Sequence, residues 1–167
     1  CLVGSEMCIR DRASGTGNMK FALNGALTVG TYDGANIEIR EAVGADNFYL
    51  FGLREEQIQE MRKNNAYNPR ACYENSEYLR RILNAVNSNM FCEKDYVLLF
   101  KVIYEELLNR DYYFLLADLE AFNKALHDAE KDYTNPQKWA KKAIINVAKI
   151  GYFSSDRAVM ELSLIHI

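Results

Sequence analysis

The sequence is poor in the residues that build metal centres and disulfide frameworks. It contains two histidines, His127 and His166, which excludes a histidine-rich metal site. Its four cysteines form no CxxC pair, and their spacings suit neither a zinc ribbon nor a small disulfide scaffold. We therefore expect reduced thiols in a cytoplasmic protein. The four are Cys1, Cys8, Cys72 and Cys92.

Long apolar runs and blocks of one charge are also missing. No stretch approaches the roughly 20 apolar residues that cross a bilayer, and the N-terminal CLVGSEMCIRDR has no apolar core of a signal peptide. The formal net charge is −3, with lysines and arginines scattered among acids. Neither nucleic acid nor a membrane is therefore an expected partner.

The 167 residues suffice for one domain with a buried core. Residues 1–12 and 163–167 share neither periodicity nor capping signals with the sequence beside them, so we interpret both ends as non-native flanks. Between them the composition changes once. Residues 13–52 form a glycine-rich segment, and residues 53–162 form a helical region of the same domain.

The glycine-rich segment predicts short elements joined by tight turns. Seven of the nine glycines lie between Gly15 and Gly52. SGTGN is expected to be a loop that opens a short helix through MKFALNGAL. Strands are expected near residues 28–31 and 47–51, with a helix through IEIREAV between them. This alternation indicates βα units on a parallel sheet.

The region from residue 53 onward predicts helices by its apolar periodicity. A helix is expected over LREEQIQEMRKN, a break near Pro69, and a second helix over YENSEYLRRILNAVNS. Two more amphipathic helices should cover DYVLLFKVIYEELLN and ADLEAFNKALHDAEKDY, the first with Leu99, Ile103 and Leu107 on its buried face. Later elements depend on capping signals. These are Asn135 as N-cap, Pro136 at the first helical position, Gly151 after the helix, and Ser154-Ser155-Asp156 before the last one.

The segment Ser14-Gly15-Thr16-Gly17-Asn18-Met19-Lys20 is the strongest candidate for chemistry. Glycines can turn backbone N–H groups toward one point, and a helix N-terminus adds positive potential, so together they can cradle a phosphate. Lys20, in the first turn of the expected helix, could act as a charge partner or as a Schiff-base nucleophile. The pattern matches neither GxGxxG nor GxxxxGK[ST]. An ordinary tight turn before a helix is the alternative.

The stretch ASGTGNMKFALNGALTVGTYDGANIEIREAVG (residues 13–44) closely resembles the pyridoxal-lysine segment of glycogen and maltodextrin phosphorylases. NFYLFGLREEQI and YTNPQKWAKKAIINVAKIGYFSSDRAV resemble the C-terminal region of the same family. The resemblance runs from about Ala13 to about Leu162. It implies an α/β fold, the last βα units of a parallel sheet with a helical tail. It further implies the C-terminal part of a two-domain glycosyltransferase of the GT-B type.

The resemblance also implies roles for individual residues. Lys20 matches the lysine that binds pyridoxal phosphate covalently as an internal Schiff base. Thr16 and Gly17 match backbone positions near the cofactor phosphate, and Ser14 and Gly15 match backbone positions that contact the glucosyl unit. No catalytic residue beyond the cofactor lysine and no metal site is expected.

The implied reaction is phosphorolysis of terminal α-1,4-linked glucose in a glucan by inorganic phosphate, which releases glucose 1-phosphate. The parent is expected to be a cytoplasmic homodimer, and this piece alone is expected to be inactive. The family carries a glutamate directly before Ala13, where this chain has Arg12. We attribute that difference to the non-native flank.

Two other functions remain open on the sequence alone. A glycogen or starch synthase would share the two-domain architecture but needs no Schiff-base lysine. A helical interaction module would explain residues 53–162 but not SGTGNMK. Among single residues, Trp139 is expected in the core and His127 on a helix surface. Asp33 and Asn36 are expected to turn the chain and cap a helix, and their closeness to the cofactor in the family leaves a functional role open.

Overall fold

The computed structural model describes residues 16–91 and 100–164. α-Helices account for well over half of these residues, and their β-structure is one pair of short strands, so the mostly helical α/β class is confirmed. The chain divides into two compact units. We call residues 16–51 and 123–164 the strand unit, and residues 52–91 and 100–122 the helical unit.

Two short parallel strands lie at the centre of the strand unit. β1 (Thr28–Gly30) pairs with β2 (Phe48–Leu50), with Val29 opposite Tyr49. α2 (Ala35–Val43) connects them, followed by the short 3₁₀ turn η1 (Ala45–Asn47). Parallel neighbours need such a crossover, because a tight hairpin would make them antiparallel. The expected parallel pair is confirmed.

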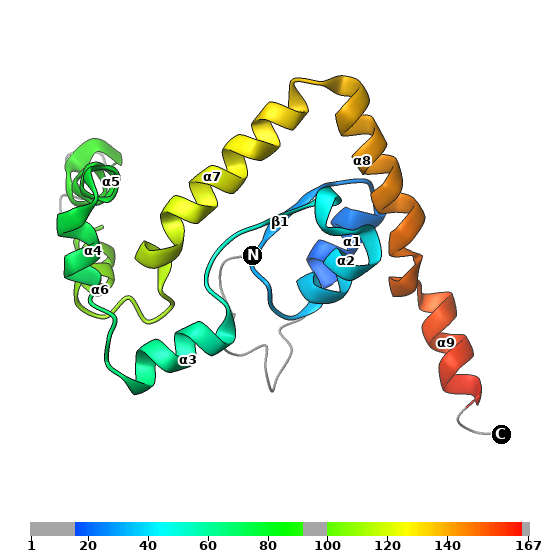
Figure 1. The fold of residues 1–167 in the computed structure, drawn as a ribbon, viewed down its shortest axis with the longest axis horizontal. Helices are drawn as coiled ribbons and strands as arrows, with labels where there is room; N and C mark the ends of the chain where they lie inside the picture. Colours follow the sequence, from blue (N-terminus) through cyan, green and yellow to red (C-terminus); the bar gives the residue numbers. More distant parts are fainter. Residues whose placement is uncertain (1–15, 92–99, 165–167) are drawn as a thin grey trace. The chain divides into compact units, whose positions relative to one another are not determined.

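The apolar core of the strand unit combines residues from an early and a late segment of the sequence. α1 (Thr16–Leu23) and α8 (Pro136–Lys149) both pack against α2, and the three helices lie side by side in Figure 1. Apolar side chains separated by more than a hundred residues therefore share one core. Its buried members are Ala22, Ile39, Val43, Phe48 and Ile150.

The C-terminal helices begin where the capping signals place them. Asn135 accepts a hydrogen bond from the Lys138 N–H (3.1 Å) and Pro136 is the first residue of α8. Ser154 accepts from the Arg157 N–H (3.3 Å), at the start of α9 (Ser155–Leu164). Gly151 directly follows Ile150, the C-cap of α8, as expected, but it lies inside a 3₁₀ turn, η4 (Ile150–Phe153), and has no left-handed φ.

A buried carboxylate connects the strands of this unit to α8. Asp132, near the end of α7 (Leu115–Tyr133), accepts a hydrogen bond from the Tyr49 hydroxyl (2.9 Å) and pairs with Lys142 (2.8 Å) and Lys138. Hydrogen bonds from Lys138 and Lys142 hold the pKa of Asp132 well below its ordinary value. Burial, and next the hydrogen bond to the same carboxylate, raise the pKa of Tyr49.

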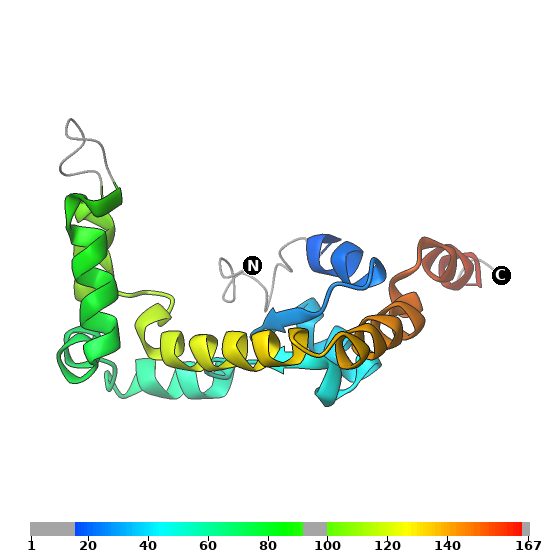
Figure 2. The ribbon, with the colours of Figure 1, turned by 90° about the horizontal axis from the view of Figure 1, so that it is seen from above.

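The helical unit is built mainly from short helices, of which α4 and α5 begin at side-chain caps. Its members are α3 (Glu55–Lys63), α4 (Pro69–Asn75), α5 (Glu77–Asn87), the 3₁₀ turn η2 (Asn89–Phe91), α6 (Lys101–Asn109) and the first part of α7. α4, α5 and α6 pack on one another, as Figure 1 and Figure 2 both show. Their core is leucine-rich: Leu79, Leu83, Leu108 and Leu116.

The structure corrects two expectations in the helical unit. The segment expected as one helix after the break at Pro69 is two helices, because Asn68 caps α4 and Ser76 caps α5. The buried face of α6 differs in part: Ile103 is 49% exposed, whereas Leu108 is buried and Leu107 packs on the same core, as expected. Leu99, expected on the same face, lies outside the described residues. Among the described helices, none is long and apolar enough to cross a bilayer.

Candidate cofactor-binding site

α1 is a short helix whose end is fixed by glycine. Gly25 has φ +82°, a left-handed value that suits glycine. Its N–H donates to the Ala22 carbonyl (3.0 Å), and the Ala26 N–H donates to the Phe21 carbonyl (3.0 Å). This pair of bonds is the Schellman arrangement. This helix end and the burial of Ala22 together determine which face of α1 is exposed to solvent.

The exposed face of α1 carries three of the candidate residues. Thr16, Gly17 and Lys20 are all exposed. Thr16 and Lys20 are four residues apart, and side chains at that spacing lie on the same face of a helix. Cα–Cβ bonds tilt toward the helix N-terminus, so the Lys20 side chain leaves the backbone in the direction of Thr16 and Gly17. Ser14 and Gly15, and Arg12 before them, lie outside the described residues.

The start of α1 differs from the expected loop. Thr16, Gly17 and Asn18 are the first helical residues, so Lys20 is the fifth residue of α1 and lies beyond its first turn. The first four N–H groups of a helix have no partner in the ladder and can donate to an anion. A Cβ built on Gly17 would meet no atom within 4 Å among the described residues, apart from its chain neighbours and the backbone of its own helix. The residues present therefore fit a phosphate-bearing cofactor.

Two asparagines that were not among the candidate site residues hold this helix. Asn18 donates through Nδ2 to Asn36 Oδ1 (2.8 Å), which joins the first turn of α1 to α2. Asn36 does not cap α2 as expected, because Gly34 occupies the N-cap position without a side-chain hydrogen bond. Asp33 accepts from the Thr31 hydroxyl (2.7 Å) and does turn the chain. In the sequence, the DGAN turn was the only signal for the contact between Asn18 and Asn36.

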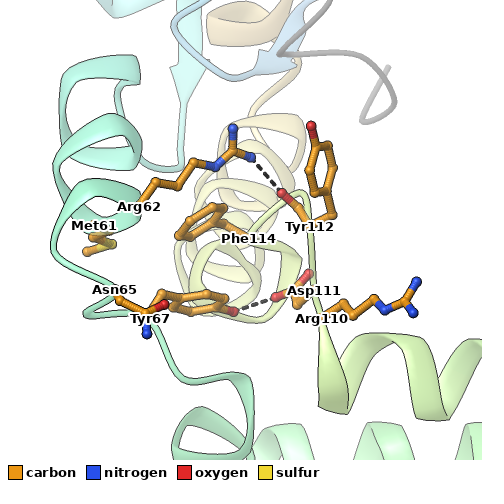
Figure 3. A pocket seen from close by; sticks show the side chains of 8 residues that line it. All are labelled: Met61, Arg62, Asn65, Tyr67, Arg110, Asp111, Tyr112 and Phe114. Carbon is orange, nitrogen blue, oxygen red and sulfur yellow. Dashed lines mark hydrogen bonds between the residues drawn. The ribbon is translucent and has the colours of Figure 1, made fainter.

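A separate hollow of about 200 Å³ lies within the helical unit (Figure 3). The Arg62 guanidinium donates to the Tyr112 carbonyl (2.9 Å) and lies over the rings of Tyr112 and Phe114. Tyr67 donates to the buried carboxylate of Asp111. Because these polar groups already serve the packing of the wall, we assign no ligand to this hollow.

Other residues are placed as follows. His127 lies on the surface of α7, 3.7 Å from Glu130, as expected. Trp139, expected in the core, is half-buried and packs edge-to-face on Tyr133 with ring centroids 5.1 Å apart. Within residues 16–91 and 100–164, no three histidine, cysteine or acidic side chains gather as a metal site would require.

A mostly helical α/β chain with a lysine on the open face of a glycine-containing helix is compatible with a phosphate-binding piece of an enzyme. A comparison with protein families identifies which enzymes: the carbohydrate phosphorylase model matches residues 9–164. The chain therefore belongs to the carbohydrate phosphorylase family, and the resemblance seen in the sequence is confirmed.

The chain is similar to curated glycogen phosphorylases from distant organisms. It is 45% identical over 149 residues to the glycogen phosphorylase of Synechocystis sp. and 47% identical over 150 residues to that of Chlamydia trachomatis. It is 43% identical over 149 residues to the brain form of Homo sapiens. Each match covers 89% of this chain but only 17% or 18% of the relative, so the chain spans less than a fifth of their length.

Proposed function

We propose that this chain is the cofactor-binding C-terminal piece of an α-glucan phosphorylase. The whole enzyme would transfer terminal α-1,4-linked glucosyl units from a glucan to inorganic phosphate and release glucose 1-phosphate. Pyridoxal phosphate would be its cofactor, bound covalently to Lys20. The observation that carries the proposal is the open face of α1, where Thr16, Gly17 and Lys20 lie together in a member of this family.

The residues of the chain would act on the cofactor and the sugar in different ways. The N–H groups at the start of α1 would donate to the cofactor phosphate, with the positive end of the helix facing it. Lys20 would hold the cofactor against that helix. The backbone at Ser14 and Gly15 would contact the glucosyl unit. Once bound, the cofactor supplies a phosphate group that exchanges a proton with the substrate phosphate.

The remaining parts of the proposal concern the parent protein. We infer a two-domain GT-B glycosyltransferase that functions as a homodimer in the cytoplasm, with this chain at the end of its second domain. The relatives named above are phosphorylases, which favours this function over a glycogen or starch synthase. A helical interaction module would leave the match over the glycine-rich segment without a reason.

The attachment of the cofactor can be tested in a chimera. In it, residues 13–162 of this chain replace the matching segment of the Synechocystis relative, so that the relative's own residue precedes Ala13. Lys20→Ala should abolish both the borohydride-trapped pyridoxal label and phosphorolysis, because no other amine is placed on the open face of α1. The label is located by peptide mass spectrometry.

Lys141→Ala is the matched control for this experiment. Lys141 is also exposed and also lies on a helix of the strand unit, near the middle of α8. Its removal should leave label and turnover within about twofold of the unsubstituted chimera, as for surface positions without special contacts. A borohydride-stable label that survives Lys20→Ala would refute the assignment of Lys20.

The chain by itself is predicted to be inactive. It spans 17% or 18% of its relatives, so an active site built between two domains would lack one wall. A two-strand parallel sheet also leaves strand edges that invite association. The test is a glucose 1-phosphate assay of the purified chain with cofactor, phosphate and maltodextrin. Turnover above the no-enzyme control from a soluble monomer would contradict this prediction. Removal of residues 1–12 and 163–167 is not expected to restore activity.

A further inference from the structure

A chain of side-chain amides fixes the first turn of α1. The Asn18 amide donates to Asn36 Oδ1 (2.8 Å), and Asn36 Nδ2 donates to the Thr31 carbonyl (3.2 Å). Asn18 Oδ1 accepts from the Met19 N–H (3.0 Å). Both Asn18 and Asn36 are half-buried, where a hydrogen bond competes less with water. The start of α1 is therefore joined through Asn36 to the loop that follows β1.

The end of β1 leaves little freedom to Asn36. A Cβ built on Gly30 would lie 2.8 Å from Asn36 Nδ2, closer than ordinary contacts permit, so only glycine leaves room for this amide. Asparagine supplies a donor toward Thr31 and an acceptor toward Asn18 from one short side chain. Aspartate would lack the donor and leucine would lack both.

The first turn of α1 needs an external support of this kind. Its N–H groups lie outside the helical ladder, and Gly17 adds backbone freedom without a side chain to pack. Among residues 16–91 and 100–164, no atom outside its chain neighbours and its own helix backbone lies within 4 Å of the Cβ position of Gly17, so side chains of other described elements do not restrain it. Without such a support, binding of a ligand to these N–H groups would include the conformational-entropy cost of ordering the first turn.

We propose that Asn36, acting through Asn18, is a positioning residue for the cofactor. It holds the first turn of α1 in the orientation in which the N–H groups of Thr16 and Gly17 face the cofactor phosphate while Lys20 holds the cofactor. This inference rests on the proposed function. It assigns Asn36 no contact with the cofactor or the substrate, because its two bonds are to Asn18 and Thr31.

The test compares, in the chimera, Asn36 at the start of α2 with Asn47 in the 3₁₀ turn that follows α2. Asn36→Ala removes the bonds at the start of α2, whereas Asn47→Ala removes a similar bond beyond its end, from Asn47 Nδ2 to the Val43 carbonyl (2.7 Å). Apo-chimera is titrated with pyridoxal phosphate to obtain Kd, and urea unfolding is measured on the same samples. Asn36→Ala should raise Kd about five- to tenfold, as the loss of one supporting hydrogen bond allows. Asn47→Ala should leave Kd within about twofold even where it lowers stability equally.

A second pair of variants reaches the same contact from other residues. Asn18→Ala breaks the bond without touching Thr31, and Gly30→Ala displaces the Asn36 amide without removing a polar group. Each should raise Kd in the same direction. The Asn18→Ala/Asn36→Ala double variant should bind no more weakly than Asn36→Ala alone, because both changes remove one interaction. If Asn36→Ala does not fold, Asn18→Ala and Gly30→Ala carry the test.

The outcomes separate this inference from the proposed function. A label on Lys20 with equal Kd values for Asn36→Ala, Asn18→Ala and the Asn47→Ala control would overturn only the positioning role. A label that survives Lys20→Ala would overturn both. A raised Kd that is shared by Asn36→Ala and Asn18→Ala, but not by Asn47→Ala, supports the proposal.

Discussion

The two units of the chain are stabilised by different kinds of contact. In the strand unit, polar side chains connect segments that are distant in sequence: Tyr49 binds Asp132, 83 residues away, and Asn146 donates to the Ala26 carbonyl (2.7 Å), 120 residues away. In the helical unit, Asn68 and Ser76 cap helices only a few residues away from their partners. The helical unit has long-range polar contacts as well, from Leu53 to Asp118 and from Tyr67 to Asp111, but these span 65 and 44 residues, so the strand unit joins the more distant segments.

The two units also treat a buried carboxylate differently. Asp132 in the strand unit has two lysine partners and a tyrosine, and its pKa is held low. Asp118 in the helical unit accepts from the Leu53 N–H (2.8 Å), and burial raises its pKa to about 6. The comparison shows that burial alone does not decide the charge of a carboxylate. The cations that surround it decide whether the charged form stabilises the fold.

Asp132→Ala is expected to cause the largest loss of stability that is confined to one unit. This change leaves the Lys142 ammonium, whose side chain is 12% exposed, without its carboxylate, and removes the acceptor of Tyr49. Breaking a buried ion pair on one side should cost about 3 kcal/mol of unfolding free energy. Hydrogen exchange in the chimera should show that loss in α2 and α8.

The helical unit provides the control for Asp132→Ala. Its α5 amides should keep their protection, since Leu79 and Leu83 of α5 pack with Leu108 and Leu116 in a separate core. Equal losses in α5 and α8 would show that the two units unfold as one. A loss below about 1 kcal/mol in α8 would mean that the ion pair contributes no more than an exposed one.

An acid titration should move the two units in opposite directions. The folded Asp118 binds its proton more tightly than the unfolded residue, whose pKa is near the ordinary 3.8. Stability of the helical unit should therefore fall as pH rises from about 4 to about 6 and remain level above that, by less than about 2 kcal/mol because solvent screens the half-buried carboxyl. Asp132 has a lowered pKa, so its stabilisation is complete above about pH 4 and is lost as pH falls below it.

Asp118→Asn distinguishes this titration from others in the helical unit. Asparagine keeps an oxygen acceptor for the Leu53 N–H but does not ionise. The variant should abolish the pH dependence between 4 and 6 in α5 exchange and leave the acid sensitivity of α8 unchanged. A pH profile of α5 identical to that of the unsubstituted chimera would assign the titration to another group.

Local signals in the sequence predicted where helices and strands lie better than they predicted which face of a helix is buried. Asn135-Pro136 predicted the start of α8, and the βαβ pattern predicted the parallel strands. The expected buried face of α6 was right at Leu107 and wrong at Ile103, because Tyr104, Leu107 and Leu108 pack on the leucine core whereas Ile103 is exposed. Periodicity cannot decide which edge of an apolar face is buried, and packing against Leu79 and Leu83 selects the edge with Leu108.

The assignment of the candidate site residues stays a prediction, whereas the expected start of the helix that carries them was wrong. Gly17 has low helix propensity, which favoured a loop. The structure begins α1 at Thr16 instead, because the Asn18–Asn36 bond and the burial of Ala22 outweigh that local preference. Asn36 lies 18 residues from Asn18, so their contact is a property of the folded unit. Such partners have no signature in a local motif.

The smallest expected loss of stability concerns the Asn-Pro motif, which begins one helix in each unit. Asn68-Pro69 begins α4 in the helical unit and Asn135-Pro136 begins α8 in the strand unit. Asn68 accepts from the Arg70 and Ala71 N–H groups (3.0 and 3.3 Å), and Asn135 accepts from Lys138 (3.1 Å). Alanine at either cap should cost about 1 kcal/mol, because a cap acts within its own first turn.

The two caps test whether the units differ only in how far apart along the sequence their contacting residues lie. Asn68→Asp and Asn135→Asp keep an acceptor oxygen and should retain most of the protection measured by hydrogen exchange in α4 and α8, whereas the alanine variants should not. Equal costs at the two sites would show that locally encoded contacts contribute alike in both units. A cost at Asn135 several times that at Asn68 would contradict this, since the start of α8 would then depend on the neighbouring Asp132–Lys138 pair as well as on its cap.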